Sequence, residues 1–266
     1  MIKEIIYKER LFQILFENVN FYNENVKFIL MNYINKYIDF KSASSEDFKN
    51  HYENFLKQYS KDSKKFINSN TYPALSNDNI YEISREEYDV FLLLSTIFTQ
   101  HRYDITTSIY NILKPLDSAL VIGSGVGIEL ELIKSSYKSI SAYDIKIDDF
   151  CNSTHKHIDF YEEEFFGSND KYNDVYIIEL LEHIHNPYEL IKNAKNSIHA
   201  SGRIIITLAI NIPQFDHVFN FDDLSDFRKE IDSLDLLIAS EKEINHNYIM
   251  NGLNTSRNIF MVLKAR

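Results

Sequence analysis

The segment from Ala119 to Leu130, Ala-Leu-Val-Ile-Gly-Ser-Gly-Val-Gly-Ile-Glu-Leu, places the strongest constraint on how this chain can fold. An apolar run leads into three alternating glycines, and the pattern of a helix start follows them. The chain of 266 residues has only 6 glycines, and Gly123, Gly125 and Gly127 are three of them. Such clustering indicates a backbone that needs positive φ or close approach to a ligand. A buried strand, a glycine turn and a helix form the start of a nucleotide pocket in α/β sheets.

The rest of the chain divides into two parts near Pro115. Residues 1–114 contain no glycine and repeat apolar residues at helical spacing, so we expect an all-helical N-terminal cap. In residues 115–266, apolar strand patterns alternate with helical ones, which predicts a Rossmann-like domain. The predicted fold is α/β, with a mostly parallel seven-stranded sheet and helices on both faces. Its strands are expected at 119–122, 139–145, 157–161, 174–180, 203–210, 236–244 and 258–264.

Three local signals predict helix ends in the first part. The sequence Ser84-Arg-Glu-Glu87 has the form of a capping box and predicts a helix that runs through residues 88–101. A short helix is expected at residues 105–113, before Pro115. Ser45 is expected to cap an earlier helix. Gln100 to Tyr103 would then end an apolar helix.

Composition limits the partners and the location. A formal net charge of −11 argues against nucleic acid as a partner, because its phosphates require a basic surface. No apolar run approaches the roughly 18–20 residues that a membrane span needs, and the charged first residues do not resemble a signal peptide. The lone Cys151 excludes an internal disulfide and fits a cytoplasmic protein. The aromatic helices at the start would suit a homodimer.

Four ordered motifs make residues from about 105 to 266 resemble the class I S-adenosylmethionine (SAM)-dependent methyltransferases of the small-molecule type. They are Leu120-Val-Ile-Gly-Ser-Gly-Val-Gly127, Ala142-Tyr-Asp144, Glu179-Leu-Leu-Glu-His-Ile-His-Asn-Pro187 and Ser201-Gly-Arg-Ile-Ile-Ile-Thr207. The resemblance implies SAM as the cofactor and a small-molecule substrate. It also implies that one of the acids Glu162 and Glu163, after the third strand, holds adenine, although a solvated turn would explain them equally well.

The residues themselves also favour SAM over a nicotinamide dinucleotide. The dinucleotide pattern Gly-x-Gly-x-x-Gly would need a glycine at Ile128. Asp144, at the end of the second strand, can accept hydrogen bonds from both ribose hydroxyls and would repel a 2′-phosphate. The family often has an acid where this chain has Val121. We therefore expect Glu129 or Glu179 to take its place near the methionyl end of SAM.

Candidate catalytic and substrate residues follow the fourth and fifth strands. His183 and His217 could remove a proton from the acceptor, since histidine titrates near neutral pH. A structural role is the alternative for His183. Asn211 and Asp216 lie beyond the fifth strand, where ligands of α/β sheets bind, although both residue types also cap loops. Upstream, Arg102 could hold a carboxylate and Tyr103 could line the pocket. The alternative for Arg102 is a favourable interaction with the helix dipole, since it is a basic residue near a helix end.

No metal site is expected from the spacing of histidines. His155-x-His157 and Glu182-His-x-His185 match neither His-Glu-x-x-His nor Cys-x-x-Cys. Residues two apart on a strand also face opposite sides, so His155 and His157 would not share an ion.

Three functions therefore compete. The first is N- or O-methylation of a small molecule, with secondary metabolism as one setting. The second is attack on the aminocarboxypropyl arm of SAM, by transfer or cyclisation, which would release methylthioadenosine instead of S-adenosylhomocysteine. The third is a SAM-binding module without catalysis.

Overall fold

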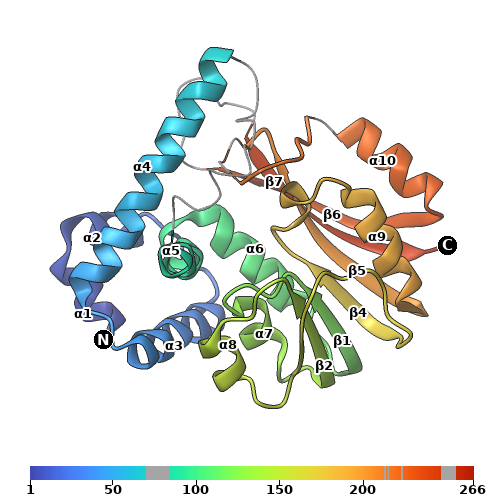
Figure 1. The fold of residues 1–266 in the computed structure, drawn as a ribbon, viewed down its shortest axis with the longest axis horizontal. Helices are drawn as coiled ribbons and strands as arrows, with labels where there is room; N and C mark the ends of the chain where they lie inside the picture. The colour runs from blue at the N-terminus through green and yellow to red at the C-terminus, as the bar shows by residue number, and fades with distance from the viewer. Residues whose placement is uncertain (70–83, 213, 215, 223, 247–255) are drawn as a thin grey trace.

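The computed structural model describes residues 1–69, 84–212, 214, 216–222, 224–246 and 256–266. Its first part is helical, and its second part is a sheet with helices on both faces (Figure 1). The helices before the sheet are α1 (Ile2–Lys8), α2 (Arg10–Glu17), α3 (Glu24–Lys41), α4 (Ser45–Ser69), α5 (Arg85–Phe98) and α6 (Gln100–Asn111). Those within the sheet region are α7 (Ile128–Ile133), α8 (Asp149–Thr154), the 3₁₀ helix η1 (Leu181–His183), α9 (Pro187–Asn196) and α10 (Leu224–Ser233).

The sheet has seven strands in the order β3-β2-β1-β4-β5-β7-β6. Strands β1 to β5 pair in parallel, and β7 lies antiparallel between β5 and β6. The predicted Rossmann-like α/β fold is therefore confirmed, with strand ends within a few residues of the expected ones. The bounds are β1 (Leu116–Ile122), β2 (Tyr137–Asp144), β3 (Asp159–Glu162), β4 (Tyr172–Ile177), β5 (Ile198–Ile210), β6 (Leu236–Asn245) and β7 (Arg257–Ala265).

Alternate residues of the central strands enter two different hydrophobic cores. Ala119 and Val121 of β1 pack in the core on one face, whereas Leu120 and Ile122 pack in the core on the other. This alternation follows from the two-residue period of a strand. It explains why the central strands are apolar throughout, since both of their faces are covered.

The N-terminal helices share the first of these cores with the sheet. That core runs from buried residues of α1 and α3 through α5 and α6 to β1, β4 and β5. Helices α3 and α6 both contact α7, the helix that follows the glycine turn. In Figure 1 these helices lie on one side of the sheet, and α9 and α10 lie on the other. The helical part is thus packed directly against the carboxyl-edge turns of the sheet.

Three predicted helix boundaries are wrong in position, and one of them is the start of the short helix expected at residues 105–113, which begins at Gln100. The helix expected over residues 88–101 ends at Phe98, because Thr99 is extended (φ −129°, ψ 132°) and a new helix, α6, begins at Gln100. Arg102 therefore lies in the first turn of a helix, where the helix dipole disfavours a cation. The cap of α4 is Ser44 and not Ser45, since the Ser44 hydroxyl accepts a hydrogen bond from the Asp47 N–H. The capping box of Ser84 and Glu87 is confirmed.

Candidate active site

The glycine turn joins β1 to α7 with a backbone that only glycine adopts easily. Gly123, Gly125 and Gly127 have φ values of 75°, 50° and 83°. A Cβ on Gly127 would lie 2.6 Å from the Tyr33 hydroxyl of α3, and a Cβ on Gly123 would lie 2.8 Å from the Leu180 side chain. Both the conformation and the close packing therefore require glycine. The expectation of positive φ at these positions is met.

Asp144, at the end of β2, binds this turn directly. Its Oδ2 accepts a hydrogen bond of 2.8 Å from the Gly125 N–H, and its Oδ1 accepts one of 3.1 Å from the Lys146 N–H. A carboxylate has about four acceptor positions, so both oxygens can still accept from hydroxyl groups. The Asp144 carboxylate is half-buried beside the turn.

The acids after β3 are exposed, and only one of them makes a bond within the described structure. Glu162 pairs in register with Asp144 across the adjoining strands, and its Oε2 accepts a 3.0 Å hydrogen bond from the Ile147 N–H. Glu163 is exposed next to it. Glu162 is therefore the better placed of the two acids to reach a ligand at Asp144.

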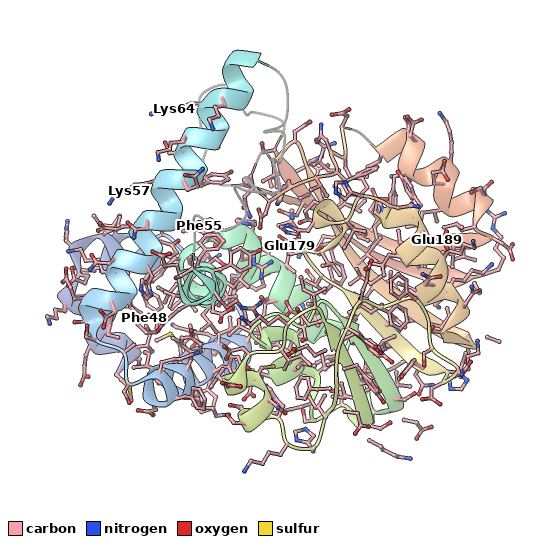
Figure 2. All side chains as sticks on the ribbon, in the orientation of Figure 1. Phe48, Phe55, Lys57, Lys64, Glu179 and Glu189 are labelled. Carbon is pink, nitrogen blue, oxygen red and sulfur yellow. The ribbon has the colours of Figure 1, made fainter. Side chains whose placement is uncertain are left out.

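Glu179, just after β4, contacts both a helix of the N-terminal part and a strand of the sheet (Figure 2). Its backbone is left-handed, with φ of 50°, a strained conformation that often marks functional sites. Its Oε1 accepts a 2.9 Å hydrogen bond from the Asn258 side chain, and its Oε2 forms a 3.2 Å ion pair with Arg102 Nη1. Burial raises the pKa of Glu129, in the first turn of α7, while Arg102 opposes the shift. One cation and two carboxylates thus interact at the carboxyl edge of the sheet.

A cavity of about 690 Å³ opens between the N-terminal helices and this edge. Its wall on the helical side is largely aromatic, and its opposite end is polar. Leu92 connects it to the glycine turn, because Leu92 lines the cavity and would lie 3.7 Å from a Cβ on Gly125. The aromatic wall comprises Tyr52, Phe55, Tyr59, Tyr88, Phe91 and Phe98, and the polar end includes Arg102, Glu179, Glu182, His183, His217, His246 and Asn258.

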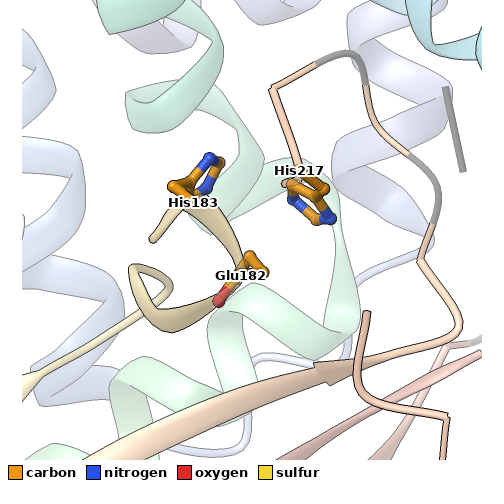
Figure 3. A group of neighbouring side chains, drawn as sticks. All are labelled: Glu182, His183 and His217. Carbon is orange, nitrogen blue, oxygen red and sulfur yellow. The ribbon is translucent and has the colours of Figure 1, made fainter. Parts of the chain in front are cut away.

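Glu182, His183 and His217 come together at the polar end (Figure 3). The two imidazole rings are perpendicular, with centroids 4.8 Å apart. Burial raises the pKa of Glu182 and lowers that of His217 to about 3. Burial also opposes the charged form of His183, but the carboxylates of Asp216 and Glu182 outweigh it and raise the pKa of His183. The cluster therefore contains a neutral imidazole beside a more basic one.

The structure does not bring every predicted substrate residue to the cavity. Tyr103 is buried, and its hydroxyl bonds to the backbone of Asn23, so it does not line the pocket. Asn211 is not among the lining residues, and its side chain donates to the Asp222 carbonyl. Asp216 does not line the cavity either, but its carbonyl oxygen lies 3.1 Å from His183 Nδ1 and so fixes that ring.

Several lining residues carried no sequence signal that we interpreted. Tyr88 lies in an apolar helix and was expected only as part of that helix, yet burial and the neighbouring Asp216 raise its pKa. His101 and His246 stack with ring centroids 4.1 Å apart. Asn258 is a buried polar residue directly before the apolar run Ile259–Leu263 of β7, and this is the signal that could have identified it as a partner in the site.

Comparison with known structures supports the same fold. The N-methyltransferase NodS from Bradyrhizobium japonicum WM9 has a TM-score of 0.51 and 12% identity, over 62% of this chain and 97% of that one. A SAM-dependent methyltransferase from Leishmania major gives 0.50 and 10%, over 62% and 72%. The [4+2]-cyclase SpnF gives 0.52 and 9%, over 62% and 82%. At these identities the likeness concerns the fold.

No curated protein gives a significant match to the sequence. Among the described residues, no helix combines the length and the apolar character required to cross a membrane. A family model described as a methyltransferase domain matches residues 97–229, half of the chain, and this range includes α6 and Arg102, the glycine turn, Asp144 and the Glu182–His183–His217 cluster. The chain belongs to this methyltransferase family and is a SAM-dependent transferase.

Proposed function

We propose that this methyltransferase acts on a small molecule with an apolar or aromatic body and one polar, nucleophilic end. The observation that carries the proposal is the cavity of about 690 Å³, lined by aromatic residues of α4 and α5 and by polar residues that follow the strands. Pockets for drug-sized ligands span roughly 300–1,000 Å³ and are mainly apolar with a few polar groups. The acceptor's apolar body would lie against Phe55, Phe91 and Phe98, and its nucleophile would point to the carboxyl edge of the sheet.

The residues present fit SAM as the cofactor. Within the described part of the chain, the Ser124 hydroxyl is buried in the glycine turn without a hydrogen-bond partner, and so is Nε of Arg102 at the cavity wall. In our proposal Asp144 accepts the ribose hydroxyls and Glu162 reaches the adenine side. Arg102 holds the carboxylate of the methionyl end, and Glu129 or Glu179 holds its ammonium group. These last two acids offset the absence of an acid at Val121.

The polar end of the cavity supports an oxygen or nitrogen nucleophile. SAM supplies an electrophilic methyl group: the acceptor's lone pair bonds to the methyl carbon, and the electron pair of the broken C–S bond stays on sulfur. The chain's own contribution is to position the acceptor and to hold a group that loses a proton. His183 is kept basic by Asp216, and His217 is kept neutral by burial, so both can act at the acceptor's hydroxyl or amine, either by direct contact or through a group that the two rings hold.

Attack on the aminocarboxypropyl arm is the competing chemistry. One fold neighbour is named a cyclase, which illustrates that this fold alone does not fix the reaction. The family match favours methyl transfer. The by-product separates the two, because methyl transfer releases S-adenosylhomocysteine and attack on the arm releases methylthioadenosine.

A pair of leucines on α2 tests the position of the acceptor. Leu15 lines the cavity, whereas Leu11, one turn earlier and also partly buried, packs against the core outside it. The proposal predicts that Leu15→Trp fills the acceptor site and lowers kcat/KM at least tenfold, with SAM affinity within about twofold of the wild type. Leu11→Trp is the matched control for the added bulk. Equal losses of activity in the two variants would contradict this position of the acceptor.

A further inference from the structure

Glu182, His183 and His217 place three metal-ligand atoms in one spot. One carboxylate oxygen and one nitrogen from each ring lie within 4.8 Å of one another. Glu182 and His183 belong to η1, after β4, and His217 belongs to the segment after β5 (Figure 3). Neighbouring parallel strands end at the same edge of a sheet, which brings these residues together although 34 positions separate His183 from His217. The sequence predicted no metal site because it was judged on the spacing of neighbouring histidines, and that spacing cannot reveal ligands from two distant segments.

Both rings are held in the orientation that metal-binding histidines use. Nδ1 of His183 lies 3.1 Å from the Asp216 carbonyl oxygen, and Nδ1 of His217 lies 2.7 Å from the Ile212 carbonyl oxygen. Because a carbonyl only accepts, each Nδ1 carries the proton, and in the neutral form of each ring Nε2 keeps its lone pair. Donation of the second ring N–H to a carbonyl or carboxylate is the usual support of a metal-bound histidine.

The Glu182 carboxylate is buried and only partly compensated by its own backbone N–H and by the neighbouring His183. The residue is 2% exposed, and its Oε2 has no hydrogen-bond partner in the described structure. A buried carboxylate oxygen that lacks a hydrogen-bond partner is unfavourable. Arg102, a cation that also lines the cavity, forms its ion pair with Glu179. Oε2 of Glu182 is therefore available to a bound cation.

We propose that Glu182, His183 and His217 bind one divalent transition-metal ion whose open positions face the cavity. Two imidazoles and one carboxylate suit Zn²⁺, Fe²⁺ or Mn²⁺ better than Mg²⁺, which prefers oxygen ligands. Three protein ligands with open positions are typical of catalytic sites and not of structural ones. Binding of the ion is independent of the reaction. Its role rests on the proposed function: the ion orients the acceptor's oxygen or nitrogen and lowers its pKa, and the proton leaves to water.

Metal binding can be measured directly on the full chain, free of tags and stripped with a chelator. Calorimetric titration with Zn²⁺, Mn²⁺ and Mg²⁺ in separate runs should give one equivalent of Zn²⁺ or Mn²⁺ and at least tenfold weaker Mg²⁺. Glu182→Gln and His217→Gln should each lower the affinity for Zn²⁺ at least a hundredfold. His185→Gln is the matched control, since His185 is exposed two positions from His183 and lies outside the cluster.

Two further readouts separate loss of the site from loss of the fold. Co²⁺ should give the wild type and His185→Gln a visible ligand-field spectrum that Glu182→Gln lacks. Zn²⁺ should raise the thermal midpoint of the wild type but not that of Glu182→Gln, whose circular dichroism stays native. Substoichiometric binding of every ion, or equal Zn²⁺ affinity in wild type, Glu182→Gln and His217→Gln, would overturn the site. Methyl transfer that survives chelation unchanged would overturn the role of the ion but leave the proposed function intact.

Discussion

Nη1 of Arg102 lies 3.2 Å from Oε2 of Glu179, an ion pair that joins the first turn of α6 to the end of β4. Arg102 at the start of a helix opposes the dipole there, so its position is explained by the carboxylates it faces. We propose that Arg102 binds the carboxylate at the methionyl end of SAM.

Arg102→Gln should lower SAM affinity roughly 10- to 100-fold, the equivalent of a lost charge-assisted hydrogen bond of about 1.5–3 kcal/mol. Methylthioadenosine lacks the amino-acid end, so its affinity should stay unchanged. Calorimetry with both ligands measures the two effects. A parallel loss for both ligands would indicate that Arg102 acts on the fold of the pocket and not on the methionyl end.

Asp144 should show the opposite selectivity. If its carboxylate accepts the ribose hydroxyls, Asp144→Asn weakens SAM and methylthioadenosine alike, by about tenfold or more, because both ligands carry the ribose. Asp149→Asn, an exposed acid in the first turn of α8, is the control for the change of charge. Unchanged binding of methylthioadenosine to Asp144→Asn would exclude the ribose contact.

The glycines of the turn should differ in their effects on stability. Gly127→Ala forces a Cβ against Tyr33 and Cys151 at a φ of 83°, so we expect a loss of about 2 kcal/mol or more in the free energy of unfolding. In Gly125→Ala the new Cβ would lie 3.7 Å from Leu92, an ordinary van der Waals distance. This variant should therefore lose only about 1 kcal/mol, the cost of positive φ for a residue other than glycine. Urea denaturation of the two variants beside the wild type gives the comparison. Equal losses would mean that packing against α3 does not matter.

Asp89 of α5 should make stability depend on pH. Burial raises its pKa to about 7, against the pull of Arg85, whose Nε lies 2.8 Å from Oδ1. Between about pH 4 and pH 7 the folded state therefore binds more protons than the unfolded state, and this group makes stability fall as pH rises. Asp89→Asn should remove that slope. The free energy of unfolding of the variant should therefore rise relative to that of the wild type by a few kcal/mol as the pH increases from 4 to 8. Denaturation curves across this range test it, and a constant difference between the two proteins would contradict it.

The sheet could be predicted because its signals are local. The alternation of Ala119, Leu120, Val121 and Ile122 into two cores requires an apolar strand, and the glycine turn after it requires glycine. The break at Thr99 was missed because neither glycine nor proline marks it. An ordinary residue in an extended conformation ends one helix there and starts the next, and this moves Arg102 from a helix end to a helix start.

The site was predictable only in part, because its contacts are made between distant segments. The sequence placed His183 and His217 after neighbouring strands, but it could not show that Glu182 would share one spot with both rings. It also could not show that the Tyr103 hydroxyl forms hydrogen bonds with the backbone N–H and carbonyl of Asn23. Such partners depend on how the N-terminal helices pack on the sheet, and no motif in the chain specifies that packing.

The central claim is methyl transfer to a small acceptor in the cavity, and one product analysis tests it most directly. The purified chain is incubated with SAM that carries a trideuterated methyl group, together with a cell extract divided by ultrafiltration into small molecules and macromolecules. Mass spectrometry then follows the label and the by-product. The account predicts a labelled small molecule formed in step with S-adenosylhomocysteine, and its loss in Leu15→Trp but not in Leu11→Trp. Label confined to macromolecules, or methylthioadenosine as the by-product, would contradict it.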